Sequence, residues 1–286
     1  MDYITDELGG TVTEARYGQT GGRITVTNAP AETPEEPEAA DWADVDADAW
    51  YAEAVHYVIE NGIMGSTSTE AKVFTPNGMV TRATVFQTLY NAQGKPEVGE
   101  TTFADVEGKW YASAAAWAEE VGLAVVPTDG GFYGERAITR AEIATIFARY
   151  AELEGKIVTD GDLSAYTDVA EDAWYADAIS WAAGEGIVSG YGDTFGPNDP
   201  ITREQLAAIL YRYAQNEGYK TSQSGKGTEG YLDASSISSY AVKAMDWAVN
   251  AGLLSGKGNN TLAPTAGATR AEVAQIFMNF CENIAK

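Results

Sequence analysis

The sequence predicts an all-α fold, in which tandem helix-loop-helix repeats pack as a pseudo-symmetric bundle behind a short β-hairpin-like N-terminal head. Three observations predict it. Four segments align with one another, landmark residues keep the same register in each segment, and apolar residues recur at helical spacing. One such helix pair cannot bury its apolar faces alone, so we expect stability to come from the stacking of neighbouring repeats.

Three landmark residues define the repeats. Each repeat has an aspartate near its start, a glycine at the end of its first half, and an arginine that follows a threonine. The aspartates are Asp44, Asp105, Asp168 and Asp233; the glycines are Gly62, Gly122, Gly186 and Gly252; the arginines are Arg82, Arg140, Arg203 and Arg270. The predicted repeats are residues 41–95, 103–153, 166–214 and 231–286.

The third repeat illustrates the predicted elements. The apolar residues of its first helix recur at helical spacing, at Trp174, Ala178, Trp181 and Ala182. The pattern stops at Gly184 and Gly186, and a loop with Phe195 and Pro197 follows. We expect the second helix to begin at Thr202, with one apolar face formed by Leu206, Ile209, Leu210 and Tyr213.

Residues 1–40 differ from the repeats. Residues 1–30 contain an alternating pattern with Gly21 and Gly22 near a bend, which predicts the last strands of an upstream β-domain. Residues 31–40 are acidic and spaced by prolines, which predicts a stiff linker. The first ten residues have neither a basic nor an apolar stretch, so we expect any signal peptide to lie on a missing N-terminal part.

Charge and composition exclude several function classes. The 42 acidic and 18 basic residues among 286 give a formal net charge of −24, which repels nucleic acid and anionic lipid. No apolar run is long enough to enter a membrane as a spanning helix. Single Cys and His residues, Cys281 and His56, are too few for a disulfide framework or a zinc cluster.

Catalytic and metal sites have little support in the sequence. Asp44, Asp46 and Asp48 are spaced like the start of an EF-hand loop, but Ala49 and Val55 occupy the positions that need glycine and glutamate. No carboxylate pair stands out from the repeat as catalytic, and catalytic sites are seldom copied four times. We therefore expect no enzyme, no metal and no cofactor.

The Thr-Arg-x-x motif is explained in part by helix capping. Thr139 with Glu142, and Thr269 with Glu272, have the form of a capping box. Thr202 with Gln205 qualifies as well. The first repeat lacks the return partner, because it has threonine at position 84.

The arginine of this motif is not explained by capping, because a cation in the first turn opposes the helix dipole. It nevertheless recurs four times, so we expect a negative group opposite it. One candidate is the aspartate of the repeat, in a structural ion pair. The other is an anionic ligand held by the guanidinium together with free amides at the helix start. Both alternatives remain open at this point.

Two sets of aromatic residues recur. The first is Trp50, Trp110, Trp174 and Tyr240, for which packing and stacking on a sugar ring are both open. The second is Tyr57, Trp117, Trp181 and Trp247, which we expect to pack between helices.

The combined motif [FY]-x-D-V…W-Y-x-x-A…F-x-P…[IV]-T-R-A-E resembles the S-layer homology domain, over about Asp41 to Lys286. The resemblance implies helical units, commonly three in a pseudo-threefold bundle, that attach exported proteins to secondary cell-wall polysaccharide, often pyruvylated, in Gram-positive bacteria. It also implies that the arginine of the motif meets the carboxylate of the pyruvyl group in a groove between repeats. The groove aspartate and tryptophan map to Asp105 with Trp110, and to Asp168 with Trp174.

This chain departs from the family pattern in several places. The second repeat has Gly134 where the others have proline, the first has Thr84 in place of the motif's glutamate, and the fourth has Tyr240 in place of tryptophan. Four repeats instead of three are a further departure. We therefore expect one unit, the first or the fourth, to pack or extend the bundle without binding.

The resulting hypothesis is a non-catalytic, extracellular cell-wall anchor that binds secondary cell-wall polysaccharide. The expected ligand-binding residues are Arg82, Arg140, Arg203, Arg270, Asp44, Asp105, Asp168, Asp233, Trp50, Trp110, Trp174, Glu142 and Glu272. The alternative is an assembly element that contacts other surface-layer subunits and uses the arginines in internal ion pairs. A third hypothesis places the end of a catalytic domain at residues 1–30.

Overall fold

A computed structural model describes most of the repeat region. The described residues are 42–153, 155, 158, 162–216, 218–222 and 225–285. The predicted head and linker, residues 1–40, lie outside them.

The described residues form eight α-helices and one 3-10 turn, without a β-sheet, which confirms the all-α prediction. The helices are α2 (Ala52–Glu60), α3 (Arg82–Ala92), α4 (Ala112–Glu120), α5 (Arg140–Leu153), α6 (Ala176–Gly184), α7 (Arg203–Asn216), α8 (Val242–Asn250) and α9 (Arg270–Asn283), and the turn is η2 (Ala234–Ser236). No helix in this part of the chain is long and apolar enough to cross a membrane.

The first helix of each repeat ends where the sequence predicts. Each of the four landmark glycines follows the helix end in a left-handed conformation, with φ angles of 66° to 74°. A side chain with a Cβ rarely adopts this conformation, so glycine allows the chain to reverse into the loop. The next residues of the loop then return toward the helix, as when the amide of Ile187 donates to the carbonyl of Ala182.

The helices pair across repeat boundaries. The second helix of each repeat packs against the first helix of the next, in the pairs α3 with α4, α5 with α6, α7 with α8, and α9 with α2. Each pair encloses a separate hydrophobic core, and Trp117, Trp181 and Trp247 are buried in three of them. Burial of these tryptophans confirms their predicted packing role, and Tyr57 packs partly buried against the fourth core.

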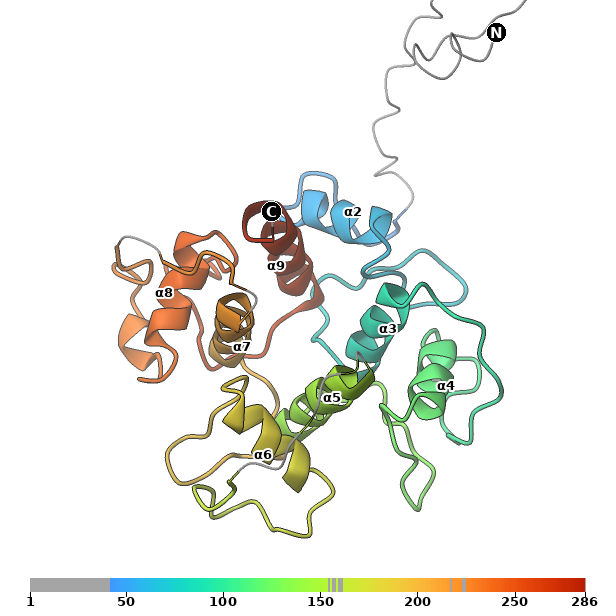
Figure 1. Ribbon diagram of the computed structural model, residues 1–286. Coiled ribbons are helices and arrows are strands. Elements are labelled where there is room, and N and C mark those ends of the chain that lie inside the picture. Colours follow the sequence, from blue (N-terminus) through green and yellow to red (C-terminus); the bar gives the residue numbers. More distant parts are fainter. Residues whose placement is uncertain are drawn as a thin grey trace, which may run out of the picture. The chain divides into compact units, whose positions relative to one another are not determined.

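The four repeats close on themselves. Isolated antiparallel bridges join Thr81 to Ala137 and Thr139 to Pro200, and another joins Thr269 to Met79. The last of these connects the fourth repeat to the first. Figure 1 shows α3, α5, α7 and α9 on the inside and α2, α4, α6 and α8 outside them. The pseudo-threefold arrangement that the resemblance implies is therefore replaced by a pseudo-fourfold one, because the fourth repeat repeats the same contact instead of extending the bundle.

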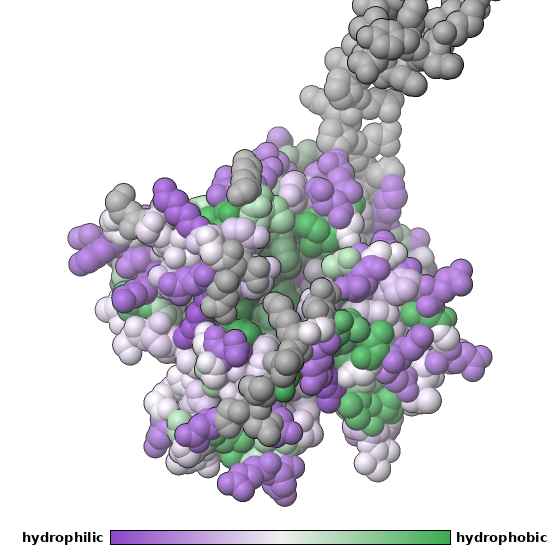
Figure 2. Space-filling model, viewed as in Figure 1, coloured by the Kyte–Doolittle hydropathy of each residue, from purple (hydrophilic) through white to green (hydrophobic). Residues whose placement is uncertain are grey.

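The visible surface of this region is mostly hydrophilic (Figure 2). Figure 2 shows hydrophilic residues around the rim of the visible face, with hydrophobic residues in smaller patches between them.

Candidate ligand-binding junctions

Four equivalent junctions form where the second helix of one repeat begins beside the loop of the next repeat. We name them by their repeats: 1–2, 2–3, 3–4 and 4–1. In each junction the arginine Nε donates to a carbonyl oxygen of the neighbouring loop. The Nε–O distances are 3.0 Å from Arg82 to Phe132, 2.8 Å from Arg140 to Phe195, 2.9 Å from Arg203 to Leu262 and 2.7 Å from Arg270 to Phe74.

The amides at these helix starts are occupied, so the expectation of free amides for an anion is wrong. The amide of Arg140 donates to the carbonyl of Asp199 at 2.9 Å, and that of Ala141 donates to Pro197 at 3.0 Å. The other three junctions repeat both bonds. The neighbouring loop runs across the helix start and satisfies the donors that a helix leaves unpaired there.

The landmark aspartates bind loop amides and do not pair with the arginines. Asp168 accepts from the amides of Phe195 and Gly196, at 2.7 and 2.8 Å. Asp44, Asp105 and Asp233 make the same two bonds in their own repeats. No ion pair joins an arginine to a landmark aspartate among the described residues. The Asp–Arg ion pair, one of the two candidates left open by the sequence, is therefore not formed among the described residues.

The capping prediction is confirmed at Thr139 and Thr269. In both, the threonine hydroxyl accepts from the amide three residues later, and the glutamate accepts from the threonine amide. In the third repeat Gln205 accepts from the amide of Thr202, but the hydroxyl of Thr202 is buried without a hydrogen-bond partner. In the first repeat the hydroxyl of Thr81 accepts from the amide of Thr84, and the hydroxyls of the two threonines lie 3.2 Å apart.

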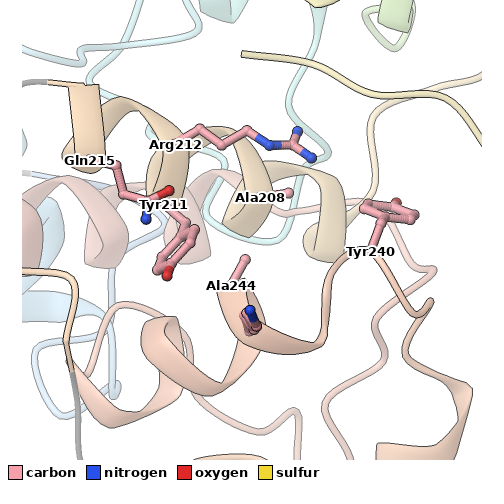
Figure 3. Close-up of a pocket in the computed structure, with 7 residues that line it drawn as sticks. Ala208, Tyr211, Arg212, Gln215, Tyr240 and Ala244 are labelled. Atoms are coloured by element: carbon pink, nitrogen blue, oxygen red, sulfur yellow. The ribbon is translucent and has the colours of Figure 1, made fainter. Parts of the chain in front are cut away.

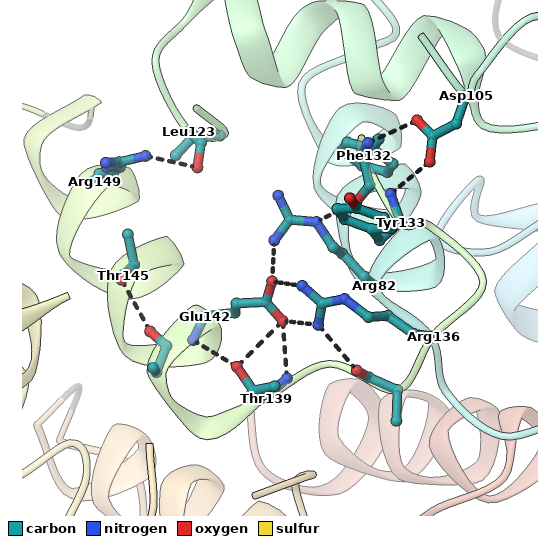
Figure 4. Close-up of polar contacts among 12 residues, drawn as sticks. Arg82, Asp105, Leu123, Phe132, Tyr133, Arg136, Thr139, Glu142, Thr145 and Arg149 are labelled. Atoms are coloured by element: carbon teal, nitrogen blue, oxygen red, sulfur yellow. Dashed lines mark hydrogen bonds and ion pairs between the residues drawn. The ribbon is translucent and has the colours of Figure 1, made fainter. Parts of the chain in front are cut away.

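The capping glutamates also neutralise arginines in two junctions. In junction 1–2, Glu142 lies between Arg82, whose Nη1 is 2.6 Å from Oε1, and Arg136, whose Nη1 is 2.7 Å from Oε2 (Figure 4). In junction 3–4, Oε1 of Glu272 lies 2.7 Å from Nη1 of Arg203 and 3.2 Å from Nζ of Lys257. Each glutamate therefore faces two cations.

Both glutamates are held in the charged form. Burial by itself would raise the pKa of Glu142, but the hydrogen bonds from Arg136, the charge of Arg82 and the amide of Thr139 together lower it. The pKa of Glu272 is lowered as well. Burial would raise it, but the hydrogen bond from the Thr269 amide and the charges of Arg203 and Lys257 outweigh burial. An internal carboxylate thus occupies the position opposite the arginine in these two junctions.

The other two junctions lack such a carboxylate. Gln205 takes the place of the glutamate in junction 2–3, and Thr84 takes it in junction 4–1. Among the described residues no carboxylate forms an ion pair with Arg140 or Arg270.

Aromatic rings surround these two unpaired arginines. The guanidinium carbon of Arg140 is 4.7 Å from the ring centre of Tyr191 and 4.4 Å from that of Phe195. The guanidinium carbon of Arg270 is 4.6 Å from the Phe74 ring centre and 5.9 Å from that of Trp110.

Burial lowers the pKa of Arg270 to about 10, although the charge of Asp44 opposes the change. A buried cation without a carboxylate is costly, and the rings recover only part of its lost solvation. An anion bound at junction 4–1 would therefore stabilise this side chain, as the internal glutamates stabilise theirs.

The four residues of the first aromatic set differ in their exposure to solvent. Trp50 and Trp174 are 60% and 63% exposed, and each meets the following tyrosine edge-on. Trp110 and Tyr240 are partly buried, and Trp110 lies over Arg270. Tyr240 instead donates its hydroxyl to Glu204 at 3.1 Å.

Several residues of the junctions were not predicted from the sequence. Arg136 and Lys257 hold the internal glutamates, and Tyr191 stacks on Arg140. Their positions are not shared by all four repeats, so alignment of the repeats does not reveal them. The fourth position of the Thr-Arg-x-x motif does distinguish the two kinds of junction. It is Thr, Glu, Gln and Glu in the four repeats, in order.

Comparison with known proteins gives a consistent result. A family model described as the S-layer homology domain matches residues 43–86, 102–144, 165–207 and 230–274. The amylopullulanase of Thermoanaerobacterium thermosulfurigenes is 32% identical over 184 residues, which are 64% of this chain and 10% of that protein. The surface-layer 125 kDa protein of Lysinibacillus sphaericus is 35% identical over 169 residues, 58% of this chain and 13% of that protein.

A third relative is the cellulosome-anchoring protein of Acetivibrio thermocellus. It is 32% identical over 149 residues, which are 49% of this chain and 33% of that protein. The chain thus spans a third or less of the length of these three relatives.

Proposed function

Because the chain belongs to the S-layer homology domain family, we propose that its four repeats form a non-catalytic module that anchors a protein to the bacterial cell wall. The names of two relatives, a surface-layer protein and a cellulosome-anchoring protein, support a place at the cell surface. The ligand that we propose is a secondary cell-wall polysaccharide with a pyruvylated, and therefore carboxylate-bearing, sugar.

The single observation that carries this proposal is the difference between paired and unpaired arginines. Arg82 and Arg203 have an internal carboxylate, whereas Arg140 and Arg270 have none among the described residues. Arg140 is only 5% exposed, so water compensates its charge poorly. A carboxylate on a sugar would supply at these two junctions what Glu142 and Glu272 supply at the others.

The aromatic residues support a sugar as the carrier of that carboxylate. Trp110 and Tyr240 stand beside the unpaired arginines, and a flat ring next to a cation suits a pyranose with an acidic substituent. The landmark aspartates act indirectly in this proposal. Asp168 holds the amide of Phe195, whose carbonyl in turn receives Arg140.

Two binding junctions on one chain would act together. Junctions 2–3 and 4–1 are contributed by different repeats, so one polysaccharide chain or two neighbouring chains can engage both. Linked sites raise the overall affinity by a factor of about 100 to 10,000 over a single site when geometry allows both to bind. The expectation that one terminal repeat alone is inactive is thus replaced by a proposal in which alternate junctions are occupied.

The test uses isosteric substitutions that give an unpaired arginine a carboxylate, or remove the carboxylate from a paired one. Gln205→Glu places a carboxylate opposite Arg140, in the position that Glu142 has opposite Arg82, and should compete with the ligand without creating a cavity. We expect at least a tenfold loss in co-sedimentation with intact Gram-positive walls, because bivalent binding is lost. Thermal unfolding should show that the variant is at least as stable as the wild type, because the new carboxylate pairs with Arg140.

Glu142→Gln is the matched control, since it makes the reverse change in a junction that we propose to be closed. Its wall binding should equal or exceed that of the wild type. Walls stripped of secondary polymer by acid should bind neither protein. Unchanged binding of Gln205→Glu, or equal binding to stripped walls, would rule out the proposed ligand site.

A second candidate function is assembly with other surface-layer subunits. The observation that favours it is the exposure of Trp50 and Trp174, which lie outside the unpaired-arginine junctions. Trp50→Ala with Trp174→Ala separates the two functions. Loss of lattice formation with intact wall binding would assign these rings to subunit contacts.

A further inference from the structure

A pocket of about 110 Å³ lies between α7 and α8, next to junction 2–3 (Figure 3). The residues from α7 that line it are Tyr211, Arg212 and Gln215. Tyr240, just before α8, and Lys243, in the first turn of α8, line the other side. Sites for whole drug-sized ligands measure about 300 Å³ or more. This pocket therefore has room for a substituent such as a carboxylate or phosphate, and not for a complete sugar ring.

The pocket is connected to the surroundings of Arg140. Nη2 of Arg140 donates to the carbonyl of Ser189 at 2.7 Å, and Nη2 of Arg212 donates to the hydroxyl of the same serine at 2.8 Å. Tyr240 lines the pocket, and its ring centre is 6.4 Å from that of Tyr191, which stacks on Arg140. A ligand that reaches Arg140 past Tyr191 therefore lies beside the pocket opening.

Three cations converge on this region of a strongly acidic chain. Arg140, Arg212 and Lys243 are all without an ion-pair partner among the described residues. Glu204 lies nearby, where it accepts hydrogen bonds from Ser238 and Tyr240. Among the described residues that line the pocket, the only charged ones are Arg212 and Lys243, so the pocket lining is cationic, and its tyrosine rings also suit a saccharide.

The other three helix pairs do not repeat this arrangement. The residues at the positions of Arg212 and Lys243 are Asn91 and Ser113 in α3–α4, Arg149 and Asp177 in α5–α6, and Asn279 and Glu53 in α9–α2. Among the helix pairs of the described residues, only α7 with α8 has a cation at both positions. Because the fold itself is the same at all four positions, the architecture does not require the pair.

We propose that the α7–α8 pocket is a second anion subsite, which receives an oxyanion substituent on the part of the saccharide adjacent to the group held by Arg140. Arg212 and Lys243 bind the oxyanion, and Tyr211 and Tyr240 flank it. The proposal rests on the proposed function for its saccharide carrier. Under this proposal, junction 2–3 binds two anionic groups of the saccharide, whereas junction 4–1 binds a single anionic group.

The first experiment probes the pocket without the polysaccharide. Inorganic phosphate and pyruvate are titrated separately into the full chain, and amide chemical shifts are followed in α7 and α8. We expect shifts at Tyr211, Gln215 and Lys243 that vanish in Lys243→Glu and persist in Lys95→Glu. Lys95 is exposed in the connection between the first two repeats, so it provides the same charge change away from the pocket.

The relative response to phosphate and pyruvate identifies the preferred oxyanion. Absence of any response in α7 and α8 to either anion, or an unchanged response in Lys243→Glu, would overturn the subsite. Lys243 is exposed and makes no ion pair in the described structure, so its replacement should leave folding intact.

The second experiment measures binding to intact walls. Lys243→Glu should weaken it about tenfold relative to Lys95→Glu, because one exposed attraction worth up to about fivefold is replaced by a repulsion. Equal binding by the two variants, with Gln205→Glu still defective, would overturn the subsite and keep the proposed function. Failure of the wild type to bind walls, with phosphate still bound in the pocket, would overturn the function and keep the anion subsite.

Discussion

One loop residue in each repeat is held from both sides. In the second repeat the amide of Phe132 donates to Asp105 at 2.6 Å, and its carbonyl accepts from Nε of Arg82 at 3.0 Å. The aspartate belongs to the same repeat and the arginine to the preceding one. The Asp and Arg landmarks are therefore coupled through the backbone of a single residue, although they do not touch as an ion pair.

This arrangement predicts a stability role for the aspartates. Asp168→Asn should lower the free energy of unfolding by about 1–3 kcal/mol, because asparagine has one acceptor oxygen in place of two and can accept from only one of the Phe195 and Gly196 amides. Urea denaturation measures the change. Asp172→Asn is the control, since Asp172 is exposed in the same repeat. A loss no larger than that of the control would contradict the proposed role.

Glu142 predicts a pH dependence. Its pKa is lowered in the folded protein, so below about pH 4.5 the unfolded chain binds more protons than the native one and the free energy of unfolding falls as the pH falls. The loss continues until the pH passes below the lowered native pKa. Urea denaturation from neutral to acidic pH should show a smaller loss in Glu142→Gln than in the wild type. Identical pH profiles would contradict the prediction, and Glu107→Gln, an exposed change, provides the control.

At the level of the helices, each pair combines the second helix of one repeat with the first helix of the next. The core around Trp117 combines Phe86 from α3 with Tyr111 and Phe132 from the second repeat. Each of the four cores in the described residues combines side chains of two repeats, so the loop of each repeat must fit the helices of two. Some loop positions depart from the common repeat pattern.

Gly134 is the clearest such departure. A Cβ at this position would lie 2.5 Å from the ring of Tyr111, which is packed in the core. Restoring the proline of the other repeats, Gly134→Pro, should therefore destabilise the protein by about 1–3 kcal/mol through overpacking. Thermal unfolding tests this, with Gly99→Ala as a control because nothing lies near its Cβ position. An increase in stability would show that the ring moves aside freely.

At the scale of the described bundle, closure is the defining property. Arg270 reaches Phe74 across 196 residues of sequence, and Ala271 donates to the carbonyl of Pro76 at 2.9 Å. The fourth junction has the same backbone bonds as the other three. The repeats therefore have no free terminal face of the kind that stacked repeats usually need to cap.

Closure predicts that circular permutation is tolerated. A short Gly/Ser linker from Lys286 to Trp42, with new ends between Gly99 and Glu100, preserves every helix pair. Its melting temperature should stay within about 5 °C of the parent, since a change of 1 kcal/mol shifts a domain of this size by about 2–4 °C. The same permutant opened between Ala144 and Thr145 interrupts α5 and should not fold. Failure of both permutants would argue against closure.

Features that depend on near neighbours could be predicted from the amino-acid sequence. The number of repeats, the helix-loop-helix order, the glycine stops and the capping boxes all follow from residues a few positions apart. Burial of Trp117, Trp181 and Trp247 follows from helical periodicity. These predictions succeed because hydrogen bonds and side-chain spacing within one helix turn are local.

Three features became visible only in the folded protein: which helices pair, that the four repeats close, and which arginines are neutralised. Those outcomes depend on distances between residues far apart in the chain, such as Arg82 and Glu142. The helix-start amides looked free in the sequence because their acceptors belong to the next repeat. The sequence therefore pointed to the arginines, whereas the docking of one repeat on another decided that Arg140 and Arg270 remain without a carboxylate in the described structure.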